Sequence, residues 1–502
     1  MIDSTARMAW LLATCRLFSP VTGGMSRAEF VRRMREDGIA LDGPRVSRWE
    51  SGSQAIGHRH LTAYEAAVGQ PEGALLAANR MLLRAAGESL PSETLPGTTV
   101  DDLDELFQLV ERLRATGGHW LRLAGDLGFY ERVYLHAATW TTVCNQLVDE
   151  LTRSSGVAFL RRHEAAVALL THPQSRRHMT RSVGRFVMHP DAQNVAPALG
   201  LLREVADEAA SELVLRLMGG KNGLLRRGAV SVAGALAAQG AFGHDSLQAL
   251  ERHAGYELRK GGDLSRRTDA IELAAQLPES GFNRVLAAIK DRETRHRVAR
   301  TRSTMELVDG TLARIIAEGV AAYAEAATNR AAPEPDQMLR RLVREGLFHV
   351  QRERRHIAAV MLGLSPYGRA VAQTVLKLTE EADDQVASMC WSLLRRLGHV
   401  VERDEVAEVA CAEKRLGLRA RGFVTTGLSR GTLNDDAADH LLKEARSSKR
   451  PSLQHAALFA LGMADHTHLA ELCQVEPEQP RRNALWWRKI GPALHDDDVP
   501  SR

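Results

Sequence analysis

The segment RRHIAAVMLGL (354–364) joins a basic pair to a helix pattern rich in small and apolar residues. Similar segments recur after residue 150: RRHEAAVALL (161–170), RRGAVSVAGALA (226–237), RRTDAIELAAQL (266–277), DQVASMCWSLLRRLG (384–398), ARGFVTTGLSRG (420–431) and LQHAALFALGMADH (453–466). In the second half, Ile357, Val386, Phe423 and Ala456 mark spacings of 29, 37 and 33 residues. Repeats of about 30 to 45 residues, each a helix pair that buries its apolar face on its neighbours, are typical of an α-solenoid.

The earlier basic pairs, at residues 161, 226, 266 and 354, lie 65, 40 and 88 residues apart, the last close to two units of 44. With its alternation of helices and short turns, region 150–475 resembles HEAT-like repeats. The predicted fold is all-α: an N-terminal five-helix helix-turn-helix domain followed by an α-solenoid of HEAT-like repeats. An irregular bundle is the alternative, because Ala/Leu-rich bundles give similar patterns. The basic pairs are interpreted as solvated or salt-bridging positions between repeats, rather than as a ridge that contacts DNA.

The length and composition predict several helical units. A chain of 502 residues is too long for one ordinary core, and runs of alternating β-branched residues are hard to find. Shifts in composition divide the chain into a helix-turn-helix domain at 1–85, a linker at 86–99, repeat regions at 100–330 and 337–492, and a disordered tail at 493–502. The sequence AAPEPD (331–336) marks the predicted break between the two repeat regions.

Charge and cysteine content exclude few functions. The net charge of +4 neither requires nor excludes nucleic acid. The five cysteines have no Cys-x-x-Cys spacing, which favours a reduced, cytoplasmic protein without a cysteine metal site: Cys15, Cys144, Cys390, Cys411 and Cys473. No uninterrupted apolar run approaches the ~18 residues of a transmembrane helix, so no membrane association is expected.

The segment GPRVSRWESG (43–52) predicts a short amphipathic helix. Asp42 or Gly43 can cap its start, Pro44 suits its first turn, and Gly52 can end it. At about 100° per residue, Val46 and Trp49 fall on one side of this helix. The opposite side carries Pro44, Ser47, Arg48 and Ser51, with Arg45 at the border. The apolar pair is therefore expected to anchor the helix and leave Arg48 pointing outward.

The segments around this helix predict four more. MSRAEFVRRMRE (25–36) begins with a capping box formed by Ser26 and Glu29. HLTAYEAAVG (60–69) and PEGALLAANRML (71–82) follow, and the first helix precedes residue 18. The N-terminal region is therefore interpreted as five short helices, with a turn between the second and third.

Three runs in this region, SRAEFV (26–31), VSRWESG (46–52) and LTAYEAAVG (61–69), resemble the Cro/lambda-repressor type of helix-turn-helix, the XRE family. The resemblance covers about residues 4–82. It implies that Trp49 and Glu50 orient the reading helix, and that ten residues contact double-stranded DNA. They are Arg27 on a phosphate, Gly43, Pro44 and Arg48 at base edges, Arg45 and Ser47 beside them, and Gln54, His58, Arg59 and His60 along the sugar-phosphate chain.

This sequence departs from the family pattern in its connections and in its base-reading positions. The connection at 37–43 is about two residues longer than the family's tight turn, and 17–25 inserts a loop after the first helix. Gly43 and Pro44 also replace side chains that the family uses to read bases, which leaves most direct readout to Arg48. The forked guanidinium group of an arginine can donate to both O6 and N7 of guanine. Such a pair of hydrogen bonds favours guanine over other bases by about 1–3 kcal/mol.

No pattern indicates catalysis, a cofactor or a metal site. His163, His172, His178 and His189 lack metalloprotease spacing and are interpreted as surface residues. The main hypothesis is a sequence-specific transcriptional regulator, a homodimer whose repeats dimerise, recruit a partner, or sense a peptide, small-molecule or protein effector. The alternative is a scaffold or adaptor, or a peptide-sensing receptor, that holds a protein or peptide in the solenoid groove.

Overall fold

The computed structural model describes residues 2–36, 39–89, 100–130, 132–205, 207–220, 222–260, 264–328, 334–475 and 478–495. Within these ranges the regular structure comprises 28 α-helices and two 3₁₀ helices. The remaining pairing consists of three isolated β-bridges, and the described residues form no sheet. The all-α prediction is therefore confirmed.

Five helices fill the N-terminal region: α1 (Ser4–Phe18), α2 (Arg27–Glu36), α3 (Gly43–Glu50), α4 (His58–Val68) and α5 (Ala74–Ala86). The capping box before α2 forms as expected, because the Ser26 N–H donates to Glu29 Oε2 at 2.7 Å and the Glu29 N–H donates to Ser26 Oγ at 3.3 Å. Asp42 caps α3 by accepting the Arg45 N–H at 2.9 Å. Local polar side chains thus determine where α2 and α3 begin.

The following helices form the first half of the body: α6 (Val100–Glu111), α7 (Gly117–Phe129), α8 (Ala137–Thr152), α9 (Gly156–Thr171), α10 (Arg176–Val187), α11 (Ala196–Leu201), η1 (Leu202–Glu204), α12 (Glu208–Met218), α13 (Gly223–Ala238), α14 (His244–Lys260), α15 (Leu264–Gln276), α16 (Glu279–Ala288) and α17 (Arg292–Thr304). The second half comprises α18 (Gly310–Thr328), α19 (Gln337–Phe348), α20 (Arg352–Leu364), α21 (Gly368–Glu381), α22 (Asp384–Leu397), η2 (Gly398–Val400), α23 (Arg403–Ala412), α24 (Leu416–Leu428), α25 (Asp435–Ser447), α26 (Pro451–Ala464), α27 (His468–Leu472) and α28 (Glu478–Ile490).

Alternate helices of the body pack into two rows. The first row runs α9, α11, α13, α15 and α17, and the second runs α20, α22, α24, α26 and α28, each helix in contact with the next in its row. The helices between them pack beside their neighbours in the chain, as in the pairs α12–α13, α14–α15, α21–α22, α23–α24 and α25–α26. The markers Ile357, Val386, Phe423 and Ala456 all fall in the second row. Stacked helix pairs are the arrangement that their spacing predicts.

Small residues let the helices of the second row approach neighbouring helices closely. A Cβ added at Gly422 would lie 2.6 Å from the Cβ of Ala410, and one at Gly462 would lie 2.3 Å from the Trp487 ring. Both distances are below ordinary contact, so any larger side chain would force the helices apart. The alanine and glycine content of the recurring segments therefore reflects packing between helices.

The C-terminal end of the second row meets the start of the first. The Leu494 N–H donates to the Arg153 carbonyl at 2.8 Å, and the Ser155 N–H donates to the Leu494 carbonyl at 3.0 Å. Leu494 is buried, so the predicted disordered tail at 493–502 is wrong for this residue: its backbone N–H and carbonyl are both hydrogen-bonded to the segment just before α9. Residues 496–502 lie outside the described residues.

Two other predicted connections lie next to helices of the structure. Helices α18 and α19, which flank the predicted break at 331–336, pack against each other. The first three residues of this break lie outside the described ranges. The linker at 86–99 begins inside α5, which extends through Ala86 and ends at Gly87 with a left-handed φ of 75°. Residues 90–99 of that linker are also outside the described ranges.

Candidate functional site

Helix α3 presents a basic residue, Arg48, on its solvent-exposed side. Val46 is 0% exposed and Trp49 is 2% exposed, whereas Arg48 is exposed. Trp49 packs on the ring of His60 in α4, with the ring centroids 5.1 Å apart. This is the orientation that the helical periodicity predicts, because the two apolar residues share one side of the helix.

A buried ion pair holds α3 against α1 and α4. The Arg16 guanidinium donates to both oxygens of Glu50, at 2.6 Å and 2.9 Å, and the Tyr64 hydroxyl donates to Glu50 Oε1 at 2.9 Å. The side chains of Arg16 and Glu50 are each 6% exposed. The position of α3 therefore depends on a charged pair that is shielded from water.

The other predicted DNA-contacting residues surround the open side of α3. The Arg27 side chain is 48% exposed and lies 3.7 Å from Glu50. Arg48 Nε donates to Gln54 Oε1 at 3.0 Å, which places both side chains on the same exposed surface. The remaining candidates occupy the start of α3 (Gly43, Pro44, Arg45 and Ser47) and the start of α4 (His58, Arg59 and His60). His60 is half-buried and packs on Trp49. Among the three candidates at the start of α4, Arg59 is the exposed one.

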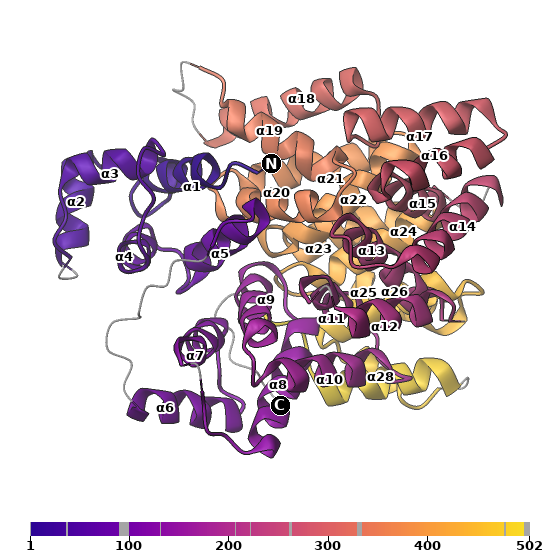
Figure 1. Cartoon of the computed structure of the whole chain (residues 1–502), viewed down its shortest axis with the longest axis horizontal. Helices are drawn as coiled ribbons and strands as arrows, with labels where there is room; N and C mark the ends of the chain where they lie inside the picture. Colours follow the sequence, from indigo (N-terminus) through magenta and orange to yellow (C-terminus); the bar gives the residue numbers. More distant parts are fainter. Residues whose placement is uncertain are drawn as a thin grey trace.

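The first and fifth helices attach this region to the body. Helix α1 packs on α20, and α5 packs on α9 and α20. Arg7 forms a 2.6 Å ion pair with Glu345, and Trp10 Nε1 donates to Asp336 Oδ2 at 2.8 Å. Figure 1 shows α2 and α3 at the outer edge of the molecule, on the side away from the body.

A second ion pair, between α5 and α9, makes stability dependent on pH. Arg84 donates to the two oxygens of Glu164 at 2.6 Å and 2.7 Å, and Glu164 is only 3% exposed. Burial alone would raise the pKa of Glu164, but Arg84 and His163 outweigh it and lower the pKa from 4.5 to about 2. Because the folded state lowers this pKa, the stabilisation is complete above pH 4.5 and is lost as the pH falls toward 2.

We therefore expect Glu164→Gln to be less stable than the wild type at pH 7, by about 3 kcal/mol. Urea unfolding of both proteins between pH 7 and pH 3 measures the difference. The free energies of unfolding of the two proteins should converge as the pH is lowered below about 4.5. Protonation of Glu164 removes from the wild type the charged ion pair that the variant already lacks. A difference that stays constant down to pH 3 would contradict the role of this carboxylate.

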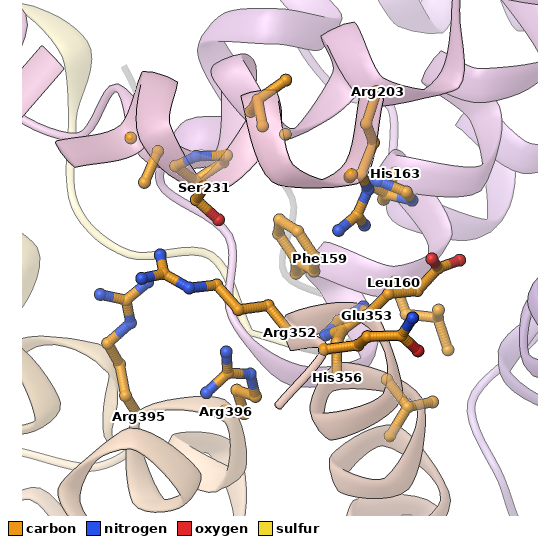
Figure 2. A pocket seen from close by; sticks show the side chains of 18 of the residues that line it. Phe159, Leu160, His163, Arg203, Ser231, Arg352, Glu353, His356, Arg395 and Arg396 are labelled. Carbon is orange, nitrogen blue, oxygen red and sulfur yellow. The ribbon is translucent and has the colours of Figure 1, made fainter. Parts of the chain in front are cut away.

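A cavity of about 350 Å³ lies between the two rows of the body. Its lining comes from α9, α11, α13 and α15 of the first row and from α20, α22, α24 and α26 of the second. Figure 2 shows the guanidinium groups of Arg352, Arg395 and Arg396 on one side of the cavity, and His163 with Arg203 on another. The two rows therefore face a shared space to which both contribute basic side chains.

Two carboxylates of α15 neutralise part of this charge. Glu272 accepts hydrogen bonds from Arg352 Nε at 2.6 Å and from Arg355 Nη2 at 2.7 Å. Arg352 also donates to Asp269. Burial would raise the pKa of Glu272, but Arg352 and Arg355 outweigh it and hold the pKa below its usual value. Glu272 is thus a charged residue that links the first row to the second.

The structure corrects two interpretations from the sequence. His163 and His172 are buried, although both were expected on the surface; His178 is half-buried and His189 is exposed. The basic pair Arg161–Arg162 is fully buried rather than solvated, because Arg161 donates to the Glu72 carbonyl and Arg162 to Glu150. The salt-bridging interpretation does hold for Arg355, which joins α20 to α15.

Sequence reasoning did not identify the cavity. The basic pair Arg395–Arg396 was the available signal, because it closes the apolar helix of one recurring segment. Across the described ranges, no group of three or more His, Cys, Asp or Glu side chains is placed to hold a metal ion. The helices in those ranges also include none with the length and hydropathy needed to cross a membrane.

Comparisons with known proteins identify no family. No family model and no curated protein matches the sequence. Among solved structures, the chain is similar to one described as "Structural Basis of Tubulin Recruitment and Assembly by Microtubule Polymerases with Tumor Overexpressed Gene (TOG) Domain Arrays". The identity is 11%, the match covers 78% of this chain and 97% of that chain, and the TM-score is 0.24. A likeness of this degree carries no argument about function.

Proposed function

We propose that this chain is a sequence-specific DNA-binding regulator whose helix α3 enters the major groove. The observation that carries the proposal is the orientation of α3: Val46 and Trp49 are buried in the N-terminal helices and Arg48 is exposed on the outer side. The groove is wide enough for an α-helix, and a forked guanidinium matches the two acceptors of guanine. Arg48 is therefore the base-reading residue of the proposal.

The residues around Arg48 suit contacts with the DNA backbone. Arg27, Gln54 and Arg59 are exposed beside or near α3, and the N-terminus of α3 begins at Gly43 after the Asp42 cap. Cationic side chains and helix N-termini hold a protein on phosphates without reading sequence. We propose that these groups set the register and that Arg48 supplies the discrimination.

A homodimer is part of the proposal. One helix unit of this size covers little DNA, so useful affinity requires two half-sites about 34–36 Å apart, one helical turn. The attachment of α1 and α5 to the body leaves α2 and α3 at the edge of the molecule, where two copies could present them to one duplex.

The second candidate is a scaffold, adaptor or peptide-sensing receptor. The observation in its favour is the cavity of about 350 Å³ between the two rows. In this function the N-terminal helices would serve only to support the body. It predicts binding to a protein or peptide and no preference among DNA sequences.

Selection from a pool of random duplexes with the full-length chain separates the two candidates. The regulator should enrich a motif with two related half-sites after several rounds. A scaffold should enrich no motif, and that result would exclude the DNA-binding proposal. The pool should be selected at near-physiological salt, because low salt promotes non-specific binding to phosphates.

A further inference from the structure

One end of the cavity holds more positive charge than its carboxylates can balance. Six arginines gather around Asp269 and Glu272, and three of them, Arg352, Arg395 and Arg396, line the cavity; the others are Arg227, Arg355 and Arg421. Glu272 pairs with Arg352 and Arg355, and Asp269 lies 3.6 Å from Arg227. None of the other three arginines forms an ion pair with a carboxylate of the described residues.

The partners of those three arginines are neutral. Arg396 donates to the Ser392 carbonyl and hydroxyl, the latter at 2.8 Å, and Arg421 donates to the Ser265 hydroxyl at 3.1 Å. Arg395 makes neither a hydrogen bond nor an ion pair with any described residue, and the surface it exposes lines the cavity. Desolvation, with repulsion from neighbouring arginines, lowers the pKa of Arg395 to about 10. Arg395 is exposed to solvent where it lines the cavity, so its guanidinium is accessible to a ligand.

A cluster of flat rings lines another part of the cavity. Phe159 packs on His163 at 5.6 Å between centroids and meets His356 edge-on at 5.9 Å. Burial, with repulsion from Arg203 and His163, lowers the pKa of His356 well below its ordinary value, so this ring is neutral. Neutral rings provide faces on which a planar group can stack.

We propose that the cavity binds a phosphorylated small molecule that carries a planar ring. Its phosphates would lie between Arg395 and Arg396, and its ring would pack in the cluster of Phe159, His163 and His356. The volume of about 350 Å³ falls within the range of small-molecule pockets. Guanidinium groups bind phosphate through paired, charge-assisted hydrogen bonds. The only other acid that lines the cavity, Glu353, is exposed and belongs to the same turn as Arg352.

The test measures ligand binding to the full-length chain without DNA, so its result does not depend on the proposed regulator function. Calorimetric titrations use pyrophosphate and the four nucleoside diphosphates ADP, GDP, CDP and UDP, with sodium chloride at matched ionic strength as a control. We expect saturable binding of at least one nucleoside diphosphate, at least tenfold tighter than pyrophosphate. If none of the four nucleoside diphosphates binds saturably, the proposal is overturned. If pyrophosphate binds as tightly as the nucleoside diphosphates, the proposed contact with the ring is overturned.

Arg395→Ala distinguishes a ligand-binding residue from a structural one. Its affinity for the nucleoside diphosphate should fall by roughly 10- to 100-fold, the value of a charge-assisted hydrogen bond. Without ligand the variant should be as stable as the wild type or more stable, because it removes a cation repelled by its neighbours. Arg181→Ala, on the exposed face of α10, is the matched control and should bind normally. Unchanged affinity in Arg395→Ala would contradict the proposal.

Discussion

Replacing Glu272 by alanine is expected to lower the free energy of unfolding by about 3–5 kcal/mol, because the change leaves the buried guanidinium of Arg355 without its carboxylate partner. Glu272 bonds Arg352 and Arg355 at once, and the side chains of Glu272 and Arg355 are only 7% and 5% exposed. Without this carboxylate, Asp269 alone would face six arginines. The variant should therefore loosen the contact between the two rows.

Urea unfolding followed by circular dichroism measures this effect. The matched control is Glu318→Ala, since Glu318 pairs with Arg314 at 3.0 Å while their side chains are 47% and 53% exposed. Exposed pairs contribute about 0–1 kcal/mol, so this variant should unfold almost as the wild type does. A Glu272→Ala variant as stable as Glu318→Ala would show that the ion pairs do not hold the rows together.

Glu50→Ala should have the second large effect, a loss of about 3–5 kcal/mol confined to the N-terminal helices. The substitution leaves Arg16 buried without its carboxylate partner and removes one of the two acceptors within hydrogen-bond distance of the Tyr64 hydroxyl. Hydrogen exchange is the appropriate measurement, because it reports local opening separately from unfolding of the body. Amides of α3 should exchange roughly 100-fold faster or more, in line with that free-energy loss.

Arg27→Ala provides the control for this effect. Arg27 also lies near Glu50, but its side chain is 48% exposed and the separation is 3.7 Å, so its removal should leave exchange in α3 nearly unchanged. Equal exchange in Glu50→Ala and the wild type would mean that apolar packing alone positions α3.

The sequence predicted the features that depend on neighbouring residues. The capping box of Ser26 and Glu29 and the cap at Asp42 involve residues three positions apart, and both form as predicted. The burial of Val46 and Trp49 follows from helical periodicity alone. The recurring alanine-rich segments likewise mark helices of the two rows, because each row needs a small apolar face.

The features that the sequence did not predict depend on contacts between distant segments. Glu272 and Arg352 are 80 residues apart, and spacing along the chain does not reveal that their helices face each other. The burial of Leu494 likewise depends on Arg153 and Ser155, which lie more than 300 positions earlier. For the same reason, the sequence alone indicates an ordinary solvated helix end at Arg395–Arg396. Only the position of the opposite row shows that these residues line a cavity.

The central claim is that Arg48 reads DNA bases, and a mobility-shift titration of Arg48→Ala on a duplex enriched by the wild type tests it most directly. At fixed salt, affinity for the enriched site should fall by the equivalent of about 1–3 kcal/mol, with binding to unrelated duplexes nearly unchanged. Arg27→Ala should instead weaken binding to all duplexes and reduce its salt dependence. If Arg48→Ala discriminates between the enriched site and unrelated DNA as well as the wild type does, the account is contradicted.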